Sequence, residues 1–379
     1  MPSTRRRAPG TISARRCTRL SVRSTQRLNP VRITFALPFI NLTGGIRVLL
    51  DYANWLHDAG HETTVVYPCW PYRFQYTRQQ QWTEFRKHAR HDGRVSWFDL
   101  RCPLLRVPLI RTRFLPRADL VVATAWPTAH DVARLHGSRG KKLHIVFHHE
   151  SGTGPEHRIR AIYRLPFYRI AFSRFVQESV EKQFGCEVQE VVPNGVDTSL
   201  FFPDGQVDDK SVLFLYHPDP RKGARDGIEV LSRLRVRIPD LQVRVCGTVR
   251  PDQLPPLMPF EFHPDDATLR RRYSTSAALV YPSRYEGFGL PPLEAMACGC
   301  PSVTTAVGAI PEFATDRQDA LIVPTGDVDA MVDRLEELLT DPALRRRLSE
   351  QGLRTAEGFS LKRIAPLFLA ALEKAHRST

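Results

Sequence analysis

Two glutamates, Glu286 and Glu294, are separated by seven residues within the glycine- and proline-rich stretch EGFGLPPLEAMACG. Its glycines permit positive φ and let a ligand approach the backbone, and its paired prolines suit the first turn of a helix. A helix start offers free N–H groups to a phosphate, whereas carboxylates accept hydrogen bonds from hydroxyl groups. The spacing therefore indicates a ligand with a diphosphate at its centre and a sugar at each end, which describes a nucleotide-sugar.

The elements that must position these glutamates follow from the flanking residues. The apolar residues 278–281 predict a buried strand, Gly299 predicts the end of a short helix, and residues 302–304 predict the next strand. Glu286 is then expected in a solvent-facing loop, and Glu294 in the first turns of the helix. A generic strand–loop–helix with two solvated glutamates is the alternative interpretation.

The same stretch resembles the signature of the family 4 retaining glycosyltransferases of GT-B fold, and the likeness extends over most of the chain after about Val31. The resemblance implies an α/β architecture of two Rossmann-like, doubly wound parallel-sheet domains that face each other across a cleft. The expected parts are an acceptor-binding domain, a nucleotide-sugar-binding domain and a C-terminal helix that crosses back to the first domain. Their expected bounds are residues 31–198, 206–359 and 360–379, in that order.

Composition and charge narrow the class of protein. The chain has 379 residues, 42% of them hydrophobic and 25% charged, which suits a globular protein of two domains. The formal net charge of +14 indicates an acidic partner, such as a phosphorylated substrate, an anionic lipid or a nucleic acid. The seven cysteines include no CxxC pair, which favours reduced thiols in a cytoplasmic protein. No apolar run approaches the ~20 residues that a membrane-spanning helix needs.

Residues 1–30 are rich in arginine and contain no acidic residue. They lack the long apolar segment of a secretory signal, and they cannot bury enough apolar surface to order themselves. A disordered basic tail is therefore expected, with an organelle transit peptide or a start codon assigned too early as the alternatives.

The chain after this tail begins with a βαβ pattern, with strands at residues 32–37 and 62–67 and a helix at residues 46–59. Gly44 and Gly45 are expected in the loop before that helix. The resemblance implies that they let the loop approach the donor phosphates and the acceptor, and a simple tight turn is the alternative. The absence of GxGxxG disfavours a dinucleotide-dependent dehydrogenase.

The resemblance also implies roles for individual residues. His148, at the tip of the strand predicted for residues 143–147, would face the donor sugar, and Lys222 would contact the diphosphate. The family usually has Gly-Arg at the end of the first strand of the second domain, where this chain has Tyr216-His217, so the arginine would be displaced to Arg221. Glu286 would orient the hydroxyl groups of the donor sugar, and Glu294 those of the ribose. The expected catalytic residues are His148, Glu286, Lys222 and Arg221, and the expected donor-binding residues are Gly44, Gly45, Gly287, Phe288, Gly289, Leu290, Glu294 and His263.

No metal or other cofactor is expected, because lysine, arginine and a helix start supply the positive charge. The motif Asp327-Val328-Asp329 resembles a metal-binding DxD, but it opens a predicted helix, where capping is the expected role.

Two basic and apolar stretches, residues 101–117 and 158–174, suggest weak attachment to an anionic membrane surface. The first lies within residues 68–117, which are expected to be irregular. The second lies mostly within residues 156–175, a candidate basic helix interrupted by Pro166, and residues 174–177 are expected to be a strand. The apolar residues proposed for shallow insertion are Leu104, Leu109, Phe167 and Phe172.

The expected function is transfer of a sugar from a nucleotide-sugar to a glycan or lipid-linked acceptor, with retention at the anomeric carbon, in the synthesis of a cell-surface polysaccharide or glycolipid. The expected location is cytoplasmic, with peripheral attachment to the inner face of the membrane left open. Two alternatives remain: a sugar-nucleotide epimerase or hydrolase of the same fold, and a basic nucleic-acid-binding protein. The second is disfavoured, and no specific nucleic acid is expected, because the basic residues are dispersed and no RRM-like aromatic motif or zinc knuckle is present.

Overall fold

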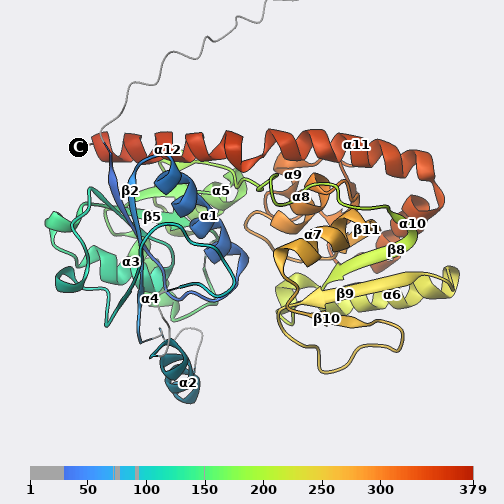
Figure 1. Cartoon of the computed structure of the whole chain (residues 1–379), viewed down its shortest axis with the longest axis horizontal. Coiled ribbons are helices and arrows are strands. Elements are labelled where there is room, and N and C mark those ends of the chain that lie inside the picture. The colour runs from blue at the N-terminus through green and yellow to red at the C-terminus, as the bar shows by residue number, and fades with distance from the viewer. Residues whose placement is uncertain (1–29, 71, 73–76, 90–93, 149, 379) are drawn as a thin grey trace, which may run out of the picture. The chain divides into compact units, whose positions relative to one another are not determined.

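The computed structural model describes residues 30–70, 72, 77–89, 94–148 and 150–378 (Figure 1). The basic tail predicted for residues 1–30 lies outside the described residues except for Pro30. Val31–Thr379 forms one compact unit. Across the described part of the chain, no helix combines the length and the apolar character needed to cross a bilayer.

The first half of the chain forms a seven-stranded parallel sheet in the order β3-β2-β1-β4-β5-β6-β7. The chain winds outward from β1 in both directions, which makes the sheet doubly wound. The central strand β4 is a short apolar run because both of its faces are buried. The strands are β1 (Arg32–Ala36), β2 (Glu62–Pro68), β3 (Leu104–Val107), β4 (Leu120–Ala123), β5 (Lys141–Val146), β6 (Tyr168–Ala171) and β7 (Glu190–Val191).

Helices cover both faces of this sheet and enclose two hydrophobic cores. The apolar side of α1 packs over one face, and α3, α4 and α5 pack over the other. The helices are α1 (Gly44–Asp58), α2 (Arg78–Ala89), α3 (Trp126–Ala133), α4 (Glu156–Tyr163) and α5 (Arg174–Phe184), with 3-10 turns at Thr112–Phe114 and Gly137–Arg139.

The second half of the chain repeats this plan with a six-stranded parallel sheet in the order β10-β9-β8-β11-β12-β13. Its strands are β8 (Asp208–Leu215), β9 (Gln242–Gly247), β10 (Phe260–Phe262), β11 (Ser276–Tyr281), β12 (Ser302–Thr305) and β13 (Leu321–Val323). Its helices are α6 (Ala224–Arg237), α7 (Asp266–Ser274), α8 (Leu290–Ala297), α9 (Ile310–Phe313), α10 (Val328–Thr340) and α11 (Pro342–Gly358), and the 3-10 turn η3 spans Pro220–Lys222.

The C-terminal helix α12 (Leu361–Arg377) packs on the first sheet rather than the second. Phe368 is fully buried there, with its ring centroid 4.4 Å from that of Tyr52. Val196 pairs with the start of the helix through a hydrogen bond from the Leu361 N–H, and a Cβ on Gly195 would lie 2.9 Å from the Leu361 Cα. The glycine therefore lets the chain leaving the first sheet pass close under the returning helix.

Three predictions about local structure in the first half of the chain are wrong. Residues 68–117 were expected to be irregular, yet they contain α2 and β3. Residues 156–175 were expected to be one interrupted helix, but α4 ends at Tyr163 and the chain continues as the buried strand β6. Residues 174–177, expected to be a strand, are the first turn of α5, whose start is capped by the Ser173 hydroxyl.

The second of these errors has a clear physical cause in Arg169. Its guanidinium is buried and donates to the carbonyls of Tyr163 and Leu165, at 2.8 and 2.7 Å, which satisfies the C-terminal end of α4. Phe167 and Phe172 are also buried in the cores of the sheet. The prediction that these two phenylalanines insert into a membrane is therefore wrong.

Candidate functional site

Glu286 lies in the loop after β11, and its side chain is nearly buried, at 9% exposed. The Lys222 ammonium lies 2.8 Å from both carboxylate oxygens, while Tyr281 and Ser283 donate hydroxyl hydrogen bonds of 2.6 and 2.8 Å to Oε1. The prediction that Glu286 lies in a loop is confirmed, whereas the prediction that it faces solvent is wrong. A buried carboxylate needs compensation for its lost hydration, and these donors supply it.

Lys222 reaches Glu286 because η3 is held tightly against the β11 loop. Gly223 ends the turn at φ 65°, and a Cβ there would lie 2.0 Å from the Pro282 carbonyl oxygen, so glycine is needed. The Arg221 carbonyl accepts N–H bonds from Arg284 and Tyr285, at 2.7 and 3.2 Å. Two loops that are distant in sequence are thus joined through their backbones.

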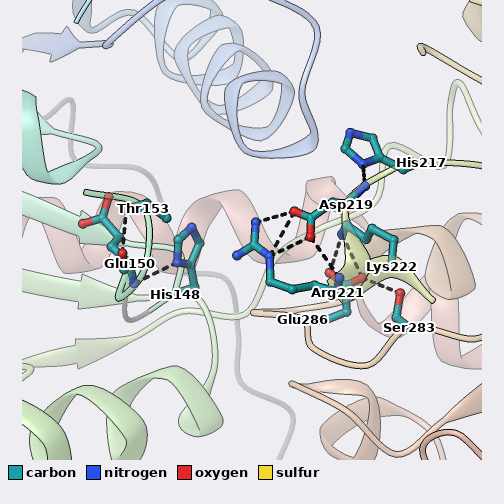
Figure 2. A network of polar contacts seen from close by, with 9 residues as sticks. All are labelled: His148, Glu150, Thr153, His217, Asp219, Arg221, Lys222, Ser283 and Glu286. Atoms are coloured by element: carbon teal, nitrogen blue, oxygen red, sulfur yellow. Dashed lines mark hydrogen bonds and ion pairs between the residues drawn. The ribbon is translucent and has the colours of Figure 1, made fainter. Parts of the chain in front are cut away.

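Arg221 is paired within its own turn. Its guanidinium donates to Asp219, at 2.7 Å for the shortest bond, and this contact raises the pKa of Arg221 and lowers that of Asp219 (Figure 2).

Sequence reasoning noted His217 but did not include it in the site. The Asp219 N–H donates to its Nδ1 at 3.1 Å, and desolvation and the nearby Lys222 lower its pKa. The sequence signal that could have identified His217 was its position, one residue after the expected end of the first strand of the second domain.

His148 stands two residues beyond β5, and its Nδ1 accepts the N–H of Glu150 at 2.9 Å (Figure 2). A neutral ring held in this way carries its proton on Nε2 and can donate from that nitrogen. Glu150 adopts φ 56°, and its carbonyl accepts the Thr153 hydroxyl at 2.6 Å. Its own carboxylate is buried, accepts the Trp126 N–H at 2.9 Å and has its pKa raised to about 8 by burial. Sequence reasoning missed Glu150, because nothing local indicates that it is buried.

The glycine loop after Glu286 contacts the ends of strands β5 and β6 in the first sheet. A Cβ on Gly287 would lie 2.0 Å from the Phe147 carbonyl oxygen, and the Ser173 hydroxyl donates to the Gly287 carbonyl at 3.1 Å. Phe288 is buried beneath the loop, and Gly289, at φ 94°, precedes Leu290 at the start of α8. Four of the eight residues predicted to bind the donor thus form a close-packed turn at a helix N-terminus.

Glu294 is partly buried on α8, where it accepts the Tyr273 hydroxyl at 2.9 Å. Burial raises its pKa, and the nearby Arg47 opposes that shift. Arg47 lies on α1 and is ion-paired with Asp266, the first residue of α7. His263 precedes that helix in a left-handed conformation, at φ 55°.

Gly44 and Gly45 were predicted to lie in the loop before the first helix, but they are the first two residues of α1. Thr43 caps the helix, with its side-chain oxygen accepting the Ile46 N–H at 3.4 Å, and this cap draws both glycines into the first turn. A Cβ on Gly45 would lie 3.7 Å from the Phe147 ring, an ordinary contact distance. Asp327 caps α10 as expected, its side chain accepting the Ala330 N–H at 2.9 Å.

The structure therefore joins some of the predicted site residues directly. Lys222 and Glu286 form an ion pair, and Gly287 touches the residue that precedes His148. Arg221 lies in the same turn as Lys222, but its guanidinium is held by Asp219. Glu294 lies further along α8 and is hydrogen-bonded to Tyr273.

Comparison with known proteins places this geometry in a family. A family model described as Glycosyl transferases group 1 matches residues 198–355, and one described as Glycosyltransferase Family 4 matches residues 42–200. The MMP alpha-(1->4)-mannosyltransferase of Mycolicibacterium hassiacum is 33% identical over 202 residues, 50% of this chain and 49% of that protein. The phosphatidyl-myo-inositol mannosyltransferase of Mycolicibacterium smegmatis is 26% identical over 353 residues, 83% of this chain and 86% of that protein.

Solved structures share the arrangement of the two sheets. Sucrose-phosphate synthase from Thermosynechococcus elongatus superposes with a TM-score of 0.69 at 19% identity, covering 90% of this chain and 98% of that one. Anabaena HepE in complex with UDP-glucose gives a TM-score of 0.69 at 15% identity, covering 91% and 100%.

The chain spans about half the length of the first curated relatives that it matches, 49% and 51%. The two family models, however, together run from residue 42 to residue 355, and the two parallel sheets have the GT-B fold of the solved structures. The chain therefore belongs to the family 4 glycosyltransferases.

Proposed function

We propose that the protein transfers a sugar from a nucleotide-sugar to a glycan or lipid-linked acceptor, with retention of configuration at the anomeric carbon. The observation that carries this proposal is the buried Glu286 carboxylate held by Lys222 beside the start of α8. The names of the relatives support it, since they include mannosyltransferases, and the solved HepE structure contains UDP-glucose. Synthesis of a cell-surface polysaccharide or glycolipid is the corresponding biological role.

The chemistry requires control of two developing charges. As the glycosidic bond breaks, negative charge grows on the leaving diphosphate and positive charge grows on the sugar ring. Lys222 and the N-terminus of α8 would stabilise the diphosphate, and Arg221, oriented by Asp219, would add a further cation. This arrangement requires no metal ion or other cofactor.

Glu286 has acceptor capacity left for a donor sugar. Among the described residues, Tyr281 and Ser283 both donate to Oε1, whereas Oε2 receives only Lys222. A carboxylate oxygen offers about two lone pairs, so Oε2 can still accept a sugar hydroxyl. Lys222 would then contact both the Glu286 carboxylate and the donor. The ion pair would therefore already hold the lysine in position when the donor binds.

His148 and Glu294 would serve the two ends of the donor. The Nε2–H of His148 would donate to the transferred sugar, since Nδ1 is already occupied by the Glu150 N–H. Glu294 would accept the ribose hydroxyls, in the orientation that Tyr273 fixes. Burial raises the pKa of Glu294, and the positive charge of Arg47 opposes this shift in favour of the ionised form that the role needs.

Attachment to the inner face of the cytoplasmic membrane is a further part of the proposal. Residues 101–117 would provide this attachment, because Leu105 and Leu109 are 39% and 45% exposed and lie among several arginines. Phe167 and Phe172, in the stretch at residues 158–174, have no part in this attachment because they are buried. The attachment would be weak, at about 1 kcal/mol for each cation near an anionic surface.

Thermal stabilisation by nucleotides tests the donor assignment. A ligand that binds only the folded state raises the melting temperature, so UDP, GDP, dTDP and their sugars are compared at saturating concentration. We expect one nucleotide series to stabilise the protein and to yield a glycosylated product. Lys222→Ala should remove the stabilisation, whereas Lys210→Ala should retain it, because Lys210 is exposed and pairs with Asp240 away from the site. Altered donor without a glycosylated product would instead identify an epimerase or hydrolase.

A further inference from the structure

A cavity of about 910 Å³ lies in the first α/β domain, apart from the Lys222–Glu286 pair. Its walls come from the segments that follow β2 and β4 and from the turn before α4, at the carboxyl end of the first sheet. Trp70 and Tyr72 line it with half-buried rings, and Trp126 lines it from the start of α3. Ligands of open α/β sheets bind at this end of the strands, and apolar cavities with a few polar groups suit small organic molecules.

The charged groups of the cavity leave an excess of positive charge. Asp131 is the carboxylate among the described lining residues, and it is occupied by the Tyr72 hydroxyl at 2.6 Å and by Arg111 at 2.7 Å. Arg134 stands 3.9 Å from Asp131 with its side chain 67% exposed. Arg158 has an exposed side chain, which forms no ion pair in the described part of the chain. Two guanidinium groups are thus available to an anion in this cavity.

The cavity wall is bonded to the turn that carries His148. Thr153 lines the cavity and donates its hydroxyl to the Glu150 carbonyl (Figure 2). Trp126 also lines the cavity, and its backbone N–H donates to the Glu150 carboxylate. The N–H of the same Glu150 donates to His148. One residue, Glu150, therefore links these two lining residues to the histidine proposed to contact the donor sugar.

We propose that this cavity binds the acceptor, and that the acceptor is a saccharide carrying a phosphate group. The inference rests on the proposed transferase function and names the substrate class for its second site. The sugar ring would pack its C–H face on Trp70 and Tyr72, and the phosphate would be held by Arg134 and Arg158. Guanidinium groups match phosphate oxygens in bidentate geometry, and two of them balance a phosphate monoester.

Two forms of this ligand would carry a phosphate group, a soluble sugar phosphate and a lipid-linked sugar diphosphate. Leu109 lines the cavity and is 45% exposed, so it is the residue that a lipid chain leaving the cavity would contact. Leu109→Ser should weaken binding of a farnesyl-diphosphate sugar and leave a hexose phosphate unaffected if the natural acceptor is lipid-linked. Equal affinities of the two probes in both proteins would assign the soluble form.

Calorimetric titration of the full-length protein, both alone and with each nucleotide of the thermal screen, tests the site. The probes are the 1-phosphates and 6-phosphates of glucose, mannose and galactose, compared with the free hexoses and with inorganic phosphate. We expect at least one sugar phosphate to bind saturably and about tenfold or more tightly than its sugar or phosphate alone. Arg134→Ala and Arg158→Ala should each weaken it by about tenfold, the loss of one charge-assisted contact. Arg164→Ala is the matched control, because Arg164 is exposed just beyond α4 and does not line the cavity.

The outcomes separate this inference from the proposed function. If no sugar phosphate binds, or if the two arginine variants bind it as tightly as Arg164→Ala does, the acceptor assignment is wrong. Stabilisation by nucleotide and transfer of sugar would still stand in that case. If no nucleotide stabilises the protein while a sugar phosphate binds through Arg134 and Arg158, the transferase function fails and the cavity remains a phosphosugar site.

Discussion

Lys222 places its ammonium nitrogen 2.8 Å from each carboxylate oxygen of Glu286, a residue 64 positions further along the chain. The carboxylate is 9% exposed and the lysine side chain 35% exposed, so the pair is partly shielded from water. In the proposed function this pair is a preformed site: the lysine would contact a phosphate while it holds the carboxylate in place for a sugar hydroxyl.

Glu286→Gln should lower turnover by about two orders of magnitude, because a neutral amide accepts hydroxyl bonds more weakly and no longer anchors Lys222. The variant should also lose about 1–3 kcal/mol of stability, since a partly buried lysine loses its partner. Asp240→Asn is the control, as it disrupts an exposed lysine pair in the same domain. Steady-state kinetics and thermal melting measure both effects, and near-wild-type turnover in a folded Glu286→Gln protein would remove Glu286 from the site.

Gly223→Ala should disturb the site through the backbone. Alanine would have to adopt φ 65° and place its Cβ 2.0 Å from the Pro282 carbonyl oxygen, which would push Lys222 away from Glu286. Gly185 is a matched control, because it has φ 63° but open space around its Cβ position. Gly185→Ala should cost about 1–2 kcal/mol for the left-handed backbone alone. Gly223→Ala should cost more and should weaken nucleotide binding, and equal losses in melting temperature and affinity would contradict this explanation.

Glu150→Gln should change how stability depends on pH. Burial raises the pKa of Glu150 to about 8, so the folded protein holds a proton that the unfolded chain releases above pH ~4.5. Its contribution to stability is therefore present at low pH and is lost as pH rises toward 8. The neutral glutamine keeps the acceptor for the Trp126 N–H and removes this titration.

His144 lies 4.0 Å from the Glu150 carboxylate, and burial lowers its pKa to about 3. Its contribution to stability is lost in the opposite direction, as pH falls below ~6.5, which leaves pH 6.5 to 8 as a window in which the titration of His144 does not oppose that of Glu150. Melting temperatures in this window should decline with pH in the wild type and stay flatter in Glu150→Gln. Parallel curves would show that Glu150 is ionised in the folded protein.

Activity should persist in excess EDTA. The proposed charge partners of the leaving diphosphate are Lys222, Arg221 and the start of α8, so removal of divalent ions should leave turnover within about twofold. Purified enzyme is assayed before and after chelation. Loss of activity that Mn²⁺ or Mg²⁺ restores would reassign the charge partner to a metal ion.

Binding to anionic vesicles should depend on salt, because the proposed attachment at residues 101–117 is electrostatic. Co-sedimentation is measured with anionic and neutral vesicles at low and high salt, after deletion of residues 1–30 so that the arginines of that segment cannot cause the effect. Leu105→Ser should reduce recovery with anionic vesicles, since Leu105 is 39% exposed within the stretch. Equal recovery with both vesicle types would exclude the membrane surface.

The sequence alone determined the features that depend on neighbouring residues. The spacing of Glu286 and Glu294, the helix that begins after Gly289 and the capping role of Asp327 all follow from local rules of glycine, proline and capping chemistry. The βαβ pattern that begins at residue 32 likewise predicted a parallel sheet in the first half of the chain, and the resemblance to the family implied a second one.

Only the tertiary structure decided which side chains are buried and which partners they have. Glu286 was expected to face solvent, but a lysine 64 positions away covers it. Arg169 was expected on a basic surface, but it is buried beneath the end of α4, and Glu150 has a buried carboxylate that no local pattern indicates. Periodicity reports the preference of a segment for helix or strand, whereas burial and pairing depend on contacts between residues far apart in the chain.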